Sequence, residues 1–293
     1  MFWCFDVLVF TLPAVQMNPL PWMTLVFLLS ARSSLAVVDQ NWLTGIVSGI
    51  RAEYKIENEQ FCLAANIPRD LDPKDLHQVL QNDRYERDVK DIIDGCVVYE
   101  GNNVVVAKPV ESVHAEPQVL QNMKQLTSNK QNNILLIYSY LSPCGEKCTK
   151  LYHQYNIIKY MTTIIKQQQK KNVPHWSDVV FVFTRVFDSP KYGNLPTKEE
   201  LKESLERLGN SGLGLQNIFR CYKPENLEFQ CHSCSSNTKV SDVCVDNNFV
   251  PGQGGRSSPV RDRSRSSSSG RSSSISRKRV KYSPSAQKSN FMG

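Results

Sequence analysis

The sequence contains no apolar run long enough to cross a bilayer. Its longest clean apolar stretch, residues 20–29, is well short of the roughly 20 residues that a spanning helix needs. We therefore expect no stable membrane span.

Glycine is also scarce, at 14 of 293 residues, which excludes a collagen-like chain. Apolar residues make up 40% and charged residues 22% of the chain, so it is not disordered throughout. The length predicts one sizeable core with appendages.

Charge is nearly absent from the first 36 positions, which contain only Asp6 and Arg32. The stretch at residues 20–29 has the length of the apolar segment of a secretory leader, although no lysine or arginine precedes it. Met17 offers an alternative start with a more conventional leader. A buried N-terminal helix or an uncleaved anchor is the alternative structure for this segment.

Small residues follow the apolar stretch at the positions that a signal peptidase reads. Ser34 and Ala36 occupy the −3 and −1 positions of a cleavage site before Val37. We therefore predict a signal peptide over residues 1–36 and a secreted protein. Such a protein folds in a compartment that permits disulfide bonds.

Acidic residues are nearly absent from the C-terminal tail. Residues 251–293 hold ten of the 35 lysines and arginines and one of the 28 aspartates and glutamates, a net charge of +9. The other 250 residues carry a net charge of −2. Because the tail has few apolar residues, we predict a disordered arm, which acts either as a solvated linker or as a sequence-independent anchor to polyanions. Its Ser-Arg dipeptides would also suit a nuclear RNA-binding protein, in conflict with a leader.

Helical and strand patterns alternate between the leader and the tail, which predicts a mixed α/β domain over residues 37–250. Helical patterns occupy residues 42–54, 72–93, 151–165 and 197–208. Strand patterns occupy residues 61–67, 134–140, 179–187 and 215–222, with a hairpin at residues 97–106. Thr197 and Glu200 form a capping box at the start of the last helix. Because that helix joins two strands, we expect a right-handed crossover and parallel pairing of the strands.

A histidine, a glutamate and two cysteines have the spacing of a metal site. His114 and Glu116 lie in the sequence VHAEP, and Cys144 and Cys148 lie in SPCGEKC. This order is the signature of zinc deaminases. One imidazole and two thiolates from these residues would bind Zn²⁺ and leave its fourth position for water, as a catalytic site requires. Glu116 is the candidate for proton transfer between that water, the ring nitrogen and the leaving ammonia.

Prolines stand where helices would begin at both motifs. Pro117 is tolerated in a first helical turn, and Pro143 is expected to open a helix that carries both thiols. The two cysteines are separated by three residues where the signature has two. Positions four apart share one face of a helix, so both thiols would still reach one metal ion.

Residues 40–222 resemble the cytidine deaminase superfamily, and within it the secreted novel AID/APOBEC-like deaminases. The similarity lies in the HAE and SPC motifs, the VFVFTR strand and the helix that ends in LGNSG. This resemblance implies a three-layer α/β fold whose five-stranded mixed sheet has its last two strands parallel and is flanked by helices. Free-nucleoside deaminases have an antiparallel hairpin there, so the helix at residues 197–208 favours a substrate in single-stranded DNA or RNA.

One aromatic residue of the family's motif is missing. Polynucleotide-editing members have the sequence SWSPC, and this chain has YLSPC, ending at Cys144. Tyr138 or Tyr140 is the expected replacement for the tryptophan. By the same resemblance, the expected substrate-binding residues are Ala115, Tyr140, Ser142 and Arg185.

Six cysteines remain outside the leader and the zinc motif. They are Cys62, Cys96, Cys221, Cys231, Cys234 and Cys244. An even number in a secreted chain predicts up to three disulfide bonds. The alternative is a second, structural zinc site formed by the last four of them.

The sequence thus predicts a secreted, zinc-dependent deaminase that converts cytosine to uracil, with foreign or viral single-stranded nucleic acid as the target implied by the resemblance. Three alternatives remain. They are a catalytically inactive binding module with the same fold, a deaminase of free cytidine or deoxycytidine, and a nuclear RNA-binding protein of the Ser-Arg type.

Overall fold

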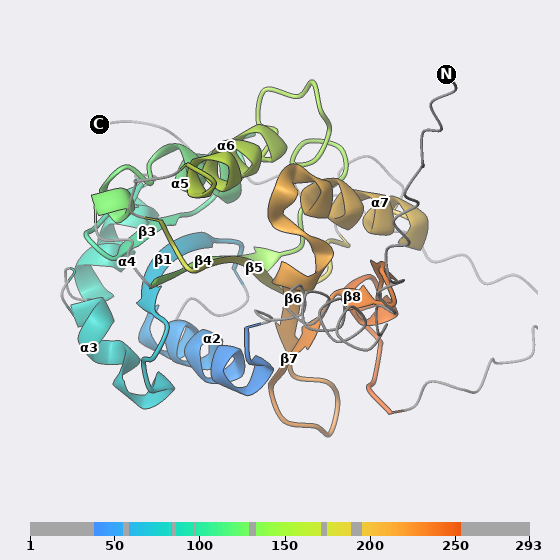
Figure 1. Cartoon of the computed structure of the whole chain (residues 1–293), viewed down its shortest axis with the longest axis horizontal. Helices are drawn as coiled ribbons and strands as arrows, with labels where there is room; N and C mark the ends of the chain where they lie inside the picture. The colour runs from blue at the N-terminus through green and yellow to red at the C-terminus, as the bar shows by residue number, and fades with distance from the viewer. Residues whose placement is uncertain are drawn as a thin grey trace, which may run out of the picture. The chain divides into compact units, whose positions relative to one another are not determined.

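The computed structural model describes most of the central part of the chain (Figure 1). The described residues are 38–252 except for 55–58, 82, 84–85, 96–97, 129–132, 171–174 and 189–194. All of them belong to one compact unit. The predicted signal peptide lies outside the described residues, and so does the predicted basic tail apart from its first two residues. Within the described part, no helix has both the length and the apolar character needed to cross a membrane.

A mixed sheet of seven strands, in the order β2-β3-β1-β4-β5-β6-β7, forms the centre of this unit. Its strands are β1 (Cys62–Pro68), β2 (Tyr99–Glu100), β3 (Val104–Ala107), β4 (Asn133–Leu141), β5 (Asp178–Arg185), β6 (Ile218–Tyr222) and β7 (Gln230–Ser233). A separate small sheet contains β8 (Ser235–Ser236) and β9 (Lys239–Val240). The main sheet has more strands than the five predicted, because the hairpin supplies both β2 and β3 and because β7 extends the far edge.

One side of the sheet has the parallel pairing that was predicted. β4 pairs parallel with β5, and β5 pairs parallel with β6, where Phe181 lies opposite Ile218. Helix α7 (Lys198–Leu208) connects β5 to β6, and the predicted capping box of Thr197 and Glu200 begins it. The added strand β7 runs antiparallel to β6.

Helices cover both faces of the sheet (Figure 1). One face packs against α2 (Gln40–Tyr54), α3 (Leu76–Gln81) and α4 (Glu86–Asp94), and the other against α5 (Ala115–Gln121), α6 (Ile158–Gln168) and α7. Short turns complete the described fold: η2 (Pro73–Asp75), η3 (Gln125–Ser128), η4 (Gly209–Leu213), η5 (Leu215–Asn217) and η6 (Asp242–Cys244). This arrangement is the three-layer α/β fold that the sequence predicted.

Strand β4 is the central element of the core. All its residues from 134 to 140 are buried, because a central strand has helices on both faces. Leu135 and Ile137 pack on the side of α5 and α6, whereas Leu136 and Tyr138 pack on the side of α2. The residue after Ile137 on the same side is Ser139, a polar side chain that is fully buried.

The segment after β4 differs from the prediction, because residues 143–150 form turns and no helix. The Cys148 N–H donates to the Cys144 sulfur at 3.4 Å, so it is not part of a helical ladder of amide and carbonyl groups. The helix expected over residues 151–165 begins only at Ile158, whose N–H donates to Asn156 Oδ1 at 2.7 Å. Leu151, expected on its buried face, is 62% exposed.

Two disulfide bonds stabilise the C-terminal part of the domain. Cys221 is bonded to Cys231 across β6 and β7, and Cys234 is bonded to Cys244. The four cysteines are therefore not the second zinc site that was the alternative. Cys62 was also a disulfide candidate, but it is a free thiol buried in the core. Cys96 lies outside the described residues.

Loss of the Cys234–Cys244 bond should lower stability. The bond closes a loop with a sequence separation of ten, and loop-closure entropy in the unfolded chain corresponds to about 2.7 kcal/mol for such a loop. We expect the double variant Cys234→Ser/Cys244→Ser to lose about that much free energy of unfolding in urea denaturation. The Cys221–Cys231 bond closes a loop with the same sequence separation, so the variant Cys221→Ser/Cys231→Ser should lose a similar amount of free energy of unfolding. Unchanged stability in both variants would contradict the pairing.

Candidate metal centre

Three side chains that could hold a metal ion meet on the α5 side of the sheet. His114 occupies the N-cap position of α5, and Cys144 and Cys148 lie in the turns that follow β4. Their ligand atoms all lie within 4.8 Å of one another. His114 Nδ1 is 3.1 Å from the Cys148 sulfur and 3.8 Å from the Cys144 sulfur, and the two sulfurs are 3.3 Å apart. The structure thus brings together the three residues that the sequence proposed as ligands.

The donor set fits a zinc ion. Zinc bonds of about 2.3 Å to sulfur and 2.0–2.1 Å to nitrogen place neighbouring tetrahedral ligand atoms roughly 3.5–3.8 Å apart. The observed separations of 3.1–3.8 Å reach that range with shifts of a few tenths of an ångström. Both cysteines are free thiols, so both sulfurs are available as ligands.

Hydrogen bonds among the three side chains shift their pKa values. The hydrogen bond from Cys148, together with that from His114, lowers the pKa of Cys144 to about 4. The same contact with Cys144 raises the pKa of His114. The Cys144 contact and burial raise the pKa of the Cys148 thiol. A metal ion binds the deprotonated forms of all three groups, so its binding would be coupled to proton release.

A buried carboxylate lies beside the three ligands. Glu116 is 1% exposed, and burial raises its pKa. Its Oε1 accepts hydrogen bonds from Ser139 Oγ at 2.8 Å and from Gln60 Nε2 at 3.1 Å. Its Oε2 is one of the few buried side-chain atoms without a hydrogen-bond partner among the described residues. The carboxylate is thus fixed through one oxygen and free at the other, and its charge acts on both His114 and Cys148.

Gln60 is a part of the site that the sequence did not indicate. Two residues before β1, it accepts a hydrogen bond from the Leu141 N–H at 2.8 Å and donates to both Glu116 and Ser139. It therefore connects the end of β4 to the carboxylate. Nothing in a glutamine before a predicted strand signals this role. Ser139 did carry a signal, since it is a hydroxyl within an otherwise apolar and aromatic strand.

Three of the expected substrate-binding residues lie around this centre. Ala115 is buried at the first position of α5. Ser142 is buried, and its Oγ accepts a hydrogen bond from the Phe187 N–H at 2.9 Å. Its own N–H donates to the Arg185 carbonyl at 2.8 Å. The Arg185 side chain is half exposed and forms an ion pair with Asp188 at 2.7 Å.

The two candidate tyrosines lie on the other face of the sheet. Tyr138 and Tyr140 belong to the core cluster on the side of α2, and Tyr138 forms a hydrogen bond with Thr184 Oγ1 at 2.8 Å. Successive side chains of a strand point to opposite faces of the sheet, and the two tyrosines are the immediate neighbours of Ser139 in β4. They therefore lie on the face opposite to Ser139. Four residues after Cys148 in the sequence, the side chain of Tyr152 is 98% exposed.

The zinc content of single variants tests the assignment of the ligands. We expect about one zinc ion per purified chain, and we expect His114→Ala and Cys148→Ala to lose most of it because three protein ligands are the minimum for such a site. Cys62→Ala is the matched control, since Cys62 is buried and free but is not part of the cluster. Inductively coupled plasma mass spectrometry measures the metal. Full zinc content in His114→Ala, or its loss in Cys62→Ala, would contradict the assignment.

A family of known proteins matches this chain. A family model described as Secreted Novel AID/APOBEC-like Deaminase 1 matches residues 40–248, more than half of the chain. No curated protein and no solved structure matches the sequence. The matched range contains the three ligands, Glu116 and both disulfide bonds. The chain belongs to this family of deaminases.

Proposed function

We propose that this member of the Secreted Novel AID/APOBEC-like Deaminase 1 family is a secreted, zinc-dependent enzyme that hydrolyses cytosine to uracil in single-stranded nucleic acid. Water is consumed and the exocyclic amine leaves as ammonia. The observation that carries the proposal is the buried carboxylate of Glu116, which has one oxygen without a partner and lies beside a histidine and two thiols.

The residues of the site have separate tasks. His114, Cys144 and Cys148 would hold the zinc ion, which when bound supplies a Lewis acid that lowers the pKa of water. Glu116 would accept a proton from the attacking water and deliver it to the pyrimidine and to the leaving amine. Burial raises the pKa of its carboxyl group, which suits a group that both accepts and releases protons near neutral pH.

Ser139 and Gln60 would orient the carboxylate for this transfer. Both donate to Oε1, so they fix the plane of the carboxylate and leave Oε2 as the atom that exchanges protons. Gln60 is itself fixed by the backbone of Leu141. A fixed base needs no reorganisation when the proton moves.

The exposed residues that follow Cys148 in the chain support a substrate in a strand of nucleic acid. Leu151 and Tyr152 are exposed next to Lys150 and lie within four residues of Cys148. Exposed aromatic rings beside cationic side chains stack the bases of single strands and attract their phosphates. The basic tail, which lies outside the described residues, would add a salt-sensitive affinity for polyanions. Foreign nucleic acid outside the cell is the target that secretion suggests.

Secretion itself is supported by the cysteines. The bonds Cys221–Cys231 and Cys234–Cys244 suit an oxidising compartment, where disulfides persist. The apolar N-terminal segment with its small residues before Val37 is consistent with the same location.

A zinc-binding module without turnover is the second candidate. The observation that favours it is the position of Tyr138 and Tyr140 on the α2 side of the sheet, so that neither replaces the missing tryptophan beside the ligands. Such a module would retain zinc and bind strands but convert no cytosine. Assays of the purified chain on single strands and on free cytidine separate this candidate from the enzyme.

Replacement of the carboxylate tests the enzymatic proposal. We expect Glu116→Gln to keep its zinc and to lose about a thousandfold in kcat on a cytosine-containing oligonucleotide, because proton transfer is lost. Glu146→Gln is the matched control, since Glu146 lies between the two cysteines but faces solvent. Uracil formation is measured by glycosylase-coupled strand cleavage. Equal activity of Glu116→Gln and the unmodified chain would remove Glu116 from the mechanism.

Replacement of the exposed aromatic ring tests the class of substrate. We expect Tyr152→Ala to raise KM for a single-stranded oligonucleotide about five- to 150-fold, the range that corresponds to the loss of one stacked base. Tyr152→Phe should retain the low KM, because it keeps the ring. Any turnover of free cytidine should be unaffected, since a nucleoside has no neighbouring base to stack. An unchanged KM for strands in Tyr152→Ala would contradict the role of this surface.

A further inference from the structure

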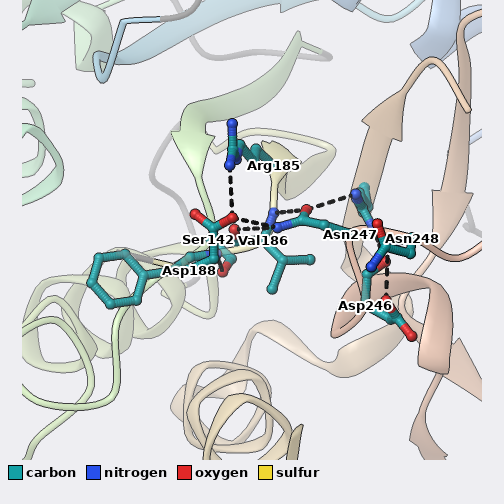
Figure 2. A network of polar contacts seen from close by, with 9 residues as sticks. Ser142, Arg185, Val186, Asp188, Asp246, Asn247 and Asn248 are labelled. Carbon is teal, nitrogen blue, oxygen red and sulfur yellow. Dashed lines mark hydrogen bonds and ion pairs between the residues drawn. The ribbon is translucent and has the colours of Figure 1, made fainter. Parts of the chain in front are cut away.

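The backbone segment that follows β5 is held at the edge of the metal centre from one side by Ser142. Figure 2 shows Val186 between Ser142 and Asn247, which belongs to the C-terminal segment. Ser142 accepts from the Phe187 N–H at 2.9 Å and donates its own N–H to the Arg185 carbonyl at 2.8 Å. Ser142 is separated from the ligand Cys144 by one residue. Residues 185–188 are therefore attached to the chain just before the turn that carries Cys144 and Cys148.

Asn247 holds the same segment from the other side. Its Oδ1 accepts from the Val186 N–H at 2.9 Å, and its Nδ2 donates to the Val186 carbonyl at 3.0 Å. Nδ2 also donates to Asp188 Oδ2 at 3.2 Å (Figure 2). A primary amide carries a donor and an acceptor side by side, so it pairs with both backbone groups of one residue as a neighbouring strand would. This pairing needs Asn247 at a fixed position.

Arg220 provides that fixed position. The side chain is 2% exposed on β6, and its Nη2 donates to Asn247 Oδ1 at 3.0 Å. Its other nitrogens donate to three carbonyls: those of Thr184 at 3.1 Å, Val243 at 2.6 Å and Asp246 at 2.7 Å. One buried guanidinium thus joins the end of β5 to the segment that carries Asn247.

Two further bonds hold the C-terminal segment against the domain. Cys244 is bonded to Cys234, whose N–H donates to the Ile218 carbonyl on β6 at 2.8 Å. Asp246 forms an ion pair with Lys198, the first residue of α7, at 2.6 Å. Asn247 therefore projects from a segment that is attached both to the sheet and to α7.

We propose that Asn247 is a positioning residue for the segment beside the metal centre: its side-chain amide holds the backbone of Val186 and the carboxylate of Asp188, and thereby keeps Arg185 and Phe187 beside Ser142. The functional part of this inference rests on the proposed deaminase activity. Arg185 is half exposed at this edge and is a candidate for contact with the phosphates of a strand. Loss of the amide should then weaken substrate binding and leave the metal and the buried carboxylate in place.

The test uses the full-length protein with Asn247→Leu, which keeps the branched shape of the side chain and removes its hydrogen bonds. Asn247→Ala is the second variant, because it cannot clash with its surroundings. Asn248→Ala is the matched control. Asn248 is the exposed neighbour of Asn247, and its hydrogen bond to Asp246 Oδ1 comes from the backbone N–H, which the substitution keeps. Hydrogen exchange of the amides of Val186 and Phe187, zinc content, and kcat and KM on a cytosine-containing oligonucleotide are measured.

We expect the Val186 and Phe187 amides to exchange about tenfold faster or more in both Asn247 variants and to be unchanged in Asn248→Ala. Zinc content should be unchanged. KM should rise about five- to twentyfold with kcat within about twofold, the pattern of lost binding and not of lost chemistry. Unchanged exchange at both amides would overturn the proposal, and so would an equal loss of zinc and kcat without a change in KM.

Failure of the two proposals can be told apart. Absence of turnover in the unmodified chain would contradict the deaminase function. The exchange rates at Val186 and Phe187 are measured without substrate, so they decide the positioning role of Asn247 whether or not the chain is active.

Discussion

The convergence of one imidazole and two thiols at a single point is the constraint on which the rest of the structure depends. His114 and Cys144 are far apart in sequence, and they meet because β1, β3 and β4 are neighbours in the sheet and α5 packs across them. The apolar core fixes these elements, and the polar groups of the site are placed at their ends. A metal ion bound there would link α5 to the turns after β4, so that binding and folding are coupled.

Two further sets of polar contacts surround the imidazole and the two thiols. Glu116 is oriented by Ser139 and Gln60 within the core. Farther out, Ser142 joins the ligand turn to residues 185–188, and Arg220 and the disulfide Cys234–Cys244 fix the C-terminal segment against the same residues. The strand β7 and the segment after it therefore have a structural reason to be part of the domain: they support the side of the site that faces the end of β5.

Much of this arrangement could be predicted from the sequence, because strong local signals agree with the tertiary structure. The capping box at Thr197, the apolar strand β5 and the crossover to β6 are examples, and so is the order of the metal ligands. The prediction failed where side chains compete with backbone pairing. The Cys148 N–H donates to the Cys144 sulfur, and the Ile158 N–H that begins α6 donates to the Asn156 side chain. The segments before these residues, which were expected to be helical, therefore form turns. Gln60 and Asn247 were not predicted, since their partners are distant in sequence and a lone amide carries no periodic signal.

The most direct test of the central claim is the zinc K-edge X-ray absorption spectrum of the purified full-length protein. We expect one nitrogen ligand at about 2.0–2.1 Å and two sulfur ligands at about 2.3 Å, with a fourth, lighter ligand. A site with four sulfur ligands, or a purified chain that binds no zinc while Cys144 and Cys148 are both reduced, would contradict it.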